Sequence, residues 1–177
     1  LAFCVQPLNM YWQPFFKGLF KLTKEQQWVL GCIGSAVMLF LMFGAWMSEK
    51  ISARITCDKT ALAVCHLTIG ACIIVIVSVQ PYAYVVLLWY WIHEIPRASI
   101  IPIKNGYVNA NIPSAERATI SSYLSAYSHL GAVIGLVVFG IITETMGIKT
   151  SWTLSGIVLT VVSIGMIIYA RRKPKSV

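Results

Sequence analysis

The chain has 177 residues, of which 58% are hydrophobic and 11% are charged, and its formal net charge is +8. A soluble domain usually carries about 25% charged residues, so this chain has too few charges to cover a water-soluble surface. Its basic residues lie between and beyond long apolar runs rather than in a basic helix. This distribution argues against a nucleic-acid partner and favours a lipid bilayer.

The first apolar segment, residues 1–12, is too short to cross a bilayer. Twelve residues of helix rise only about 18 Å, whereas the hydrocarbon core is about 30 Å thick. The segment also has no initiator Met and no basic flank, so it does not resemble a signal peptide. We interpret it as the second half of a truncated helix, which makes the chain a fragment.

Four longer stretches contain no Asp, Glu, Lys or Arg. A helix that spans the bilayer needs about 20 predominantly apolar residues. The second stretch is long enough for most of two helices, with Gln80-Pro81 supplying the turn. The sequence therefore predicts an all-α, polytopic transmembrane bundle that forms one membrane domain over residues 1–177. Besides the truncated helix, five full spans are expected near 28–48, 60–80, 82–104, 117–143 and 151–170.

Basic residues are divided unequally between the two ends of these helices. The segments 13–27, 80–82 and 144–150 share one side, which carries Lys17, Lys21, Lys24 and Lys149. The opposite side carries Lys50, Arg54, Lys59, Lys104, Arg117, Arg171, Arg172, Lys173 and Lys175. Because the richer side is cytoplasmic, we expect a multi-pass protein of the plasma (inner) membrane with a basic cytoplasmic tail at 171–177.

Ionisable residues inside a membrane span are costly and usually functional. Glu94 and Arg97 are spaced i, i+3 in the predicted helix 82–104, so they share a helical face. Two interpretations remain open: a self-neutralising pair that holds helices together, or a polar cavity wall where Glu94 binds a proton or a cationic substrate. His93 and Tyr90 adjoin this pair, and His129, in another span, is a further candidate proton relay.

The segment 109–122 reads NANIPSAERATISS. It resembles the junction between the tenth and eleventh helices of major facilitator superfamily transporters, where the pattern N-x-x-[IVL]-P-x-x-x-R-A-T-x-x-S recurs on the cytoplasmic side. The matching residues are Asn109, Ile112, Pro113, Arg117, Ala118, Thr119 and Ser122. Independently, Pro113 is expected to end a helix, Ser114 to cap the next one, and Arg117 to pair with Glu116, bind lipid phosphate or bond a neighbouring helix end.

Two other segments resemble the same family. Residues 11–15, YWQPF, are similar to the outer end of the seventh helix in some members. Residues 44–54 resemble the second copy of the family's loop motif, with Glu49, Lys50 and Arg54 as its charges, although Ala45 and Ser52 stand where glycines are common. The resemblance implies that the chain runs from mid-helix seven to helix twelve, and that its main partner is the missing N-terminal half of the same transporter.

The resemblance implies secondary active transport (a permease) of a small organic solute by alternating access, and we expect proton coupling. No HExxH motif, nucleophile elbow, P-loop or CxxC pair is present in the sequence, so no enzymatic activity, metal or cofactor is expected. Two alternatives remain: a non-transporting receptor or assembly subunit on a transporter scaffold, and a membrane-embedded lipid enzyme.

Overall fold

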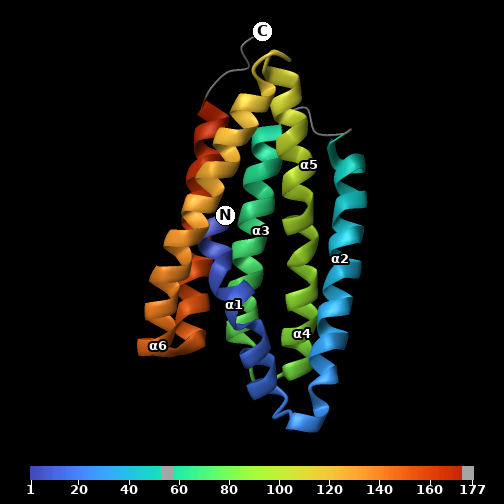
Figure 1. The fold of residues 1–177 in the computed structure, drawn as a ribbon, viewed down its shortest axis with the longest axis vertical. Coiled ribbons are helices and arrows are strands. Elements are labelled where there is room, and N and C mark those ends of the chain that lie inside the picture. Colours follow the sequence, from blue (N-terminus) through green and yellow to red (C-terminus); the bar gives the residue numbers. More distant parts are fainter. Residues whose placement is uncertain (53–57, 173–177) are drawn as a thin grey trace.

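The computed structural model describes residues 1–52 and 58–172. In this part of the chain, long helices run side by side in one bundle and no strand is present, which confirms the all-α fold (Figure 1). The elements are α1 (Ala2–Leu19), the short 3-10 helix η1 (Lys24–Gln26), α2 (Trp28–Ser52), α3 (Asp58–Ser78), α4 (Ala83–Ile92), α5 (Glu94–Asn111) and α6 (Arg117–Arg172).

The helix α6 consists of two limbs that fold back on each other at Gly147 (Figure 1). Gly147 has φ 85° and ψ 164°, a backbone conformation essentially confined to glycine. This residue therefore breaks the helix and lets limb 148–172 return beside limb 117–146. The reversal falls within the segment 144–150, where a turn was expected.

The helices α4 and α5 follow one another along a common line and are separated at His93 (Figure 1). His93 itself keeps a helical conformation, with φ −65° and ψ −21°. Pro96 explains the interruption, because it has no N–H to donate to the carbonyl of Ile92. The predicted span 82–104 is thus two shorter helices in the structure.

Several helices end later than the charge pattern suggested. The first helix continues through Pro14 to Leu19 rather than ending at residue 12, and α5 continues to Asn111 rather than to 104. Similarly, α2 reaches Ser52, so Lys50 lies in a helical turn rather than in a loop. A charged residue marks the edge of an apolar run but does not end a helix, whereas Pro113 interrupts the backbone just after α5.

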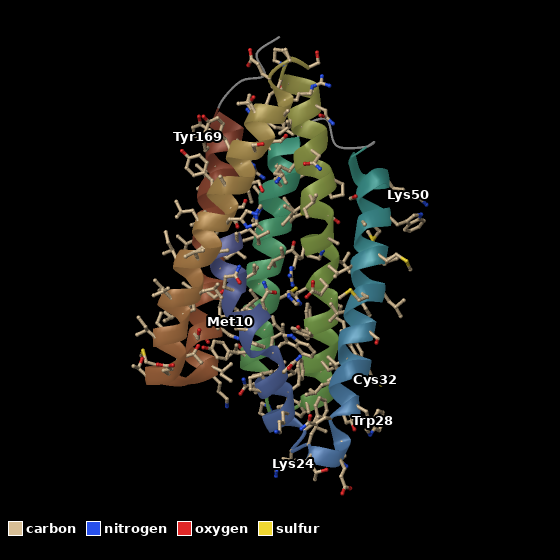
Figure 2. The ribbon with its side chains drawn as sticks, in the orientation of Figure 1. Met10, Lys24, Trp28, Cys32, Lys50 and Tyr169 are labelled. Atoms are coloured by element: carbon tan, nitrogen blue, oxygen red, sulfur yellow. The ribbon has the colours of Figure 1, made fainter. Side chains whose placement is uncertain are left out.

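Three segments are long and apolar enough to cross a membrane by their length and composition: Lys24–Ser48, Lys59–Ser78 and Arg117–Arg171. Their large apolar side chains are largely exposed on α2 and α6, as expected where lipid or further protein covers them. Figure 2 shows Trp28 and Cys32 near one end of α2 and Lys50 near the other, so the helix extends along most of the bundle.

The core lies around α3, which is central in the bundle and packs against α4, α5 and α6 (Figure 1). Its residues Ile69, Ile73 and Ile76 are fully buried. Gly70 and Gly156 let α3 and the second limb of α6 approach closely, since a Cβ on Gly70 would lie 3.1 Å from the Gly156 carbonyl oxygen. Small residues at such crossings are typical of helix packing in membranes.

Candidate functional site

Glu94 and Arg97 form an ion pair at the start of α5. Nη1 of Arg97 is 2.8 Å from Oε1 and 3.1 Å from Oε2 of Glu94. The i, i+3 spacing on one helical turn brings the two groups together, as the sequence predicted. Glu94 is 1% exposed, whereas the Arg97 side chain is 29% exposed.

Arg97 uses one nitrogen for both of these hydrogen bonds. The bonds to Glu94 come from Nη1, and the described residues provide no partner for Nε or Nη2. These two nitrogens form one edge of the guanidinium plane, which can donate two parallel hydrogen bonds to a carboxylate or phosphate. The pair therefore retains donor capacity on the side of Arg97 that is open.

His93 completes the cluster from its buried side. The ring is 0% exposed, Nδ1 is hydrogen-bonded to the Tyr90 carbonyl, and Nε2 lies 3.5 Å from Oε1 of Glu94. Because a carbonyl only accepts, Nδ1 carries the proton, and in the neutral ring Nε2 is the free acceptor. Nε2 has no hydrogen-bond partner among the described residues, so it is placed to accept from a protonated Glu94.

An aromatic wall borders the cluster on the side of α1. The buried Tyr90 ring meets Phe16 edge-on at 4.9 Å between centroids and stacks on Trp12 at 6.4 Å. Trp91, the residue after Tyr90, faces α2 instead. Its Nε1 donates to the Ile33 carbonyl at 3.2 Å and its ring stacks on Phe40.

The other candidate histidine lies apart from this cluster. His129 is exposed on the first limb of α6 and makes no described hydrogen bond or ion pair with Glu94, Arg97 or His93. The structure therefore brings together four of the five residues predicted for the cavity. A proton-relay role for His129 stays a prediction without a contact to the cluster.

The predicted loop motif, residues 44–54, lies mostly in the last turns of α2 and is only partly described. Lys50 lies 4.0 Å from the centroid of the Trp46 ring. The side chain of Glu49 and the whole of Arg54 lie outside the described residues.

The junction between α5 and α6 is held by Arg117. Its Nε donates a 2.9 Å hydrogen bond to the carbonyl of Ile112, the residue immediately after α5. This is the third of the contacts considered for Arg117, a bond to the end of the neighbouring helix. Asn109 and Thr119 are exposed. Ser114 does not cap α6, because the helix begins at Arg117 and Ser114 lies in the preceding turn.

A crossing between α2 and α5 beside the cluster was missed from the sequence. Ser99 donates to the Gly44 carbonyl at 2.9 Å and to the Ile95 carbonyl at 3.0 Å. Gly44 packs directly on the α5 backbone, since a Cβ there would lie 2.9 Å from Cα of Ile95. The adjacent small residues Ala98 and Ser99 were the available signal, but sequence alone does not say which helix they face.

The described residues also line a cavity of about 740 Å³ away from the charged cluster. It lies between the last turns of α1, the segment after α3 and the turn of α6, and it is lined by residues such as Phe15, Gln80 and Lys149. Its walls are mainly apolar, and none of the predicted site residues lines it.

The comparisons with known proteins agree with this architecture. The family model described as Major Facilitator Superfamily matches residues 2–177. A search of curated proteins and a search of solved structures each found no match. Since the family model covers nearly the whole chain, the chain belongs to the Major Facilitator Superfamily, whose members are multi-pass membrane transporters of small molecules.

Proposed function

We propose that this chain is the C-terminal half of a secondary active transporter that moves a small organic solute by alternating access and is driven by protons. The observation that carries this proposal is the Glu94–Arg97 pair, with its carboxylate buried at the start of α5. Ionisable groups inside membrane helices are costly and mark substrate paths or proton relays. Family membership supports transport, and the pair supplies the chemistry.

Alternating access needs a second half against which this bundle can rock. The exposed apolar side chains of α2 and of the first limb of α6 support such packing, because a water-facing surface of this kind is unfavourable. The N-terminal half of the same transporter is the proposed partner, with the solute bound between the halves near the middle of the bilayer.

Proton coupling is proposed to act through Glu94. When its carboxylate is charged, Glu94 holds Nη1 of Arg97. A proton on Glu94 removes the Coulomb attraction within the pair and can be shared with Nε2 of His93, 3.5 Å away. Protonation would thereby free Arg97, so that proton binding and solute binding become coupled.

The orientation proposed for the chain places the α5–α6 junction and the C-terminal tail in the cytoplasm of a plasma (inner) membrane protein. The asymmetry of basic residues supports this orientation. Arg117, bonded to the carbonyl of the residue immediately after α5, would then tie two helix ends together on the cytoplasmic side. We propose that this bond latches the helices in one state of the transport cycle.

The substitution Glu94→Gln in the full-length protein tests this function. It keeps the shape of the side chain but removes the titratable group, so pH-dependent transport should be lost while solute exchange at one fixed pH persists. Glu144→Gln, at an exposed position on α6, is the matched control. Unchanged transport with unchanged pH dependence in Glu94→Gln would remove Glu94 from the mechanism.

A receptor or assembly subunit built on the same scaffold makes a different prediction for this experiment. In such a protein the wild type would move no solute, and Glu94→Gln would leave signalling or assembly intact. A membrane-embedded lipid enzyme would require a nucleophile or metal cluster. The described residues contain no group of three or more His, Cys, Asp or Glu side chains able to hold a metal.

A further inference from the structure

The two members of the charged pair differ sharply in access. Glu94 is 1% exposed in this chain alone, so side chains of the same bundle already seal its carboxylate. Arg97 is 29% exposed. Adding further protein can only cover these groups more, so a solute that reaches the pair meets the guanidinium first.

The open side of Arg97 is also the side with unused donors. Nη1 is occupied by Glu94, while Nε and Nη2 have no partner in the described part of the chain. Neither of these unpartnered nitrogens is fully buried, so both can be reached from the open side. Together they present a planar, two-pronged donor edge.

Lipid hydrocarbon is an unfavourable neighbour for this edge. An arginine in contact with hydrocarbon is costly in the middle of a bilayer. The Arg97 side chain is nevertheless 29% exposed in this chain. Its open edge is therefore expected to face a water-filled cavity or a polar group of the other half of the transporter.

The same facts argue against an organic cation as the solute. Glu94 is sealed and already bonded, and the Tyr90 ring is 4% exposed, so neither a free carboxylate nor an open aromatic face is available. A cation approaching the pair would instead meet the positive guanidinium. Repulsion at this contact would disfavour its binding.

We propose that Arg97 is the solute-binding residue and that its Nε and Nη2 donate two parallel hydrogen bonds to a carboxylate or phosphate group of an organic anion. Glu94 then acts as a positioning residue that holds the guanidinium from behind. This inference rests on the proposed transport function and narrows its substrate class. Arginine suits this role because its rigid fork matches planar oxyanions, whereas lysine offers only a point charge.

Transport by the full-length protein in liposomes tests the substrate class. A proton gradient is imposed across the liposome membrane, directed inward in one experiment and outward in another. An equimolar mixture of carboxylates, sugar phosphates, primary amines and uncharged sugars is added outside. Mass spectrometry then compares the solutes inside with those in protein-free liposomes. Accumulation of carboxylates or phosphates supports the proposal. Accumulation of amines or sugars alone overturns it but leaves transport intact, and no accumulation at all overturns the transport function as well.

The variant Arg97→Lys tests the residue itself, because it keeps the charge that neutralises Glu94 but lacks the fork. Anion uptake should fall at least about tenfold, equivalent to 1.4 kcal/mol. Lys104→Gln, which removes a positive charge seven residues along the same helix, should transport like the wild type. Equal anion uptake by Arg97→Lys and the wild type would overturn the assignment.

A measurement on the wild type alone guards against a folding defect in the variant. Benzoate should compete with the accumulated anion at least about tenfold more strongly than benzamide, which has nearly the same shape but no charge. Equal competition by the two compounds would show that the site does not recognise an oxyanion.

Discussion

The hydroxyl of Ser99 donates a 2.9 Å hydrogen bond to the carbonyl of Gly44 and so joins α5 to α2. The contact occurs next to the charged pair, because a Cβ on Gly44 would lie 2.9 Å from Cα of Ile95 and 3.0 Å from Cβ of Ala98. The crossing thereby fixes how α5 is rotated, and with it the direction in which Arg97 points.

Gly44→Ala should destabilise the protein and disturb the pair. The added methyl would meet backbone atoms, and overpacking of this kind costs about 1–3 kcal/mol. Gly31→Ala is the matched control, because Gly31 lies in the same helix with nothing within 4 Å of its Cβ position. Thermal unfolding in detergent should show a lower midpoint for Gly44→Ala only. Equal midpoints for the two variants would contradict the close crossing.

Gly147→Ala should weaken the reversal within α6. The φ of 85° and ψ of 164° at this position are strained for any residue with a Cβ, at a cost of about 1–3 kcal/mol. Gly140→Ala, in a helical part of α6 with open space around it, should be neutral or slightly stabilising. The same unfolding assay compares them, and a Gly147→Ala midpoint at or above the wild-type value would rule out this backbone conformation at the turn.

Trp152→Phe should loosen α1 from the second limb of α6. The buried Trp152 donates from Nε1 to the Pro7 carbonyl at 3.0 Å, and its ring lies 4.3 Å from that of Phe15. Loss of the donor should cost about 1 kcal/mol. Trp28→Phe changes a tryptophan that is 68% exposed and should have little effect on stability. If both variants unfolded alike, the bond to Pro7 would not contribute to stability.

The coupling between Glu94 and Arg97 is measurable with Glu94→Gln, Arg97→Gln and the double variant. Arg97→Gln alone leaves a buried carboxylate without its partner, so it should be the most destabilising of the three. The double variant should recover part of that loss, giving a coupling energy of about 0.5–3 kcal/mol in the unfolding assay. Strictly additive effects would mean that the pair does not act as a unit in the folded protein.

The sequence was informative wherever a local pattern decides the structure. Charge-free runs indicated where the helices lie, and the i, i+3 spacing joined Glu94 to Arg97. Helix ends were less predictable, because α2 continues past Lys50 to Ser52 and α5 continues past Lys104 to Asn111. The exposure of the Glu94 and Arg97 side chains could not be predicted from the sequence either. Both residues lie on one helical face, but the burial of Glu94 depends on packing with other segments of the chain. The Gly44–Ser99 contact, across 55 positions, depends on the same long-range packing.

Proton movement during solute transport tests the central claim most directly. The full-length protein would be placed in liposomes that contain a pH-sensitive dye, and a solute that the wild type transports would then be added. We predict a change of internal pH that accompanies solute entry in the wild type and disappears in Glu94→Gln. Solute entry in the wild type without any proton movement would contradict proton-coupled transport through Glu94.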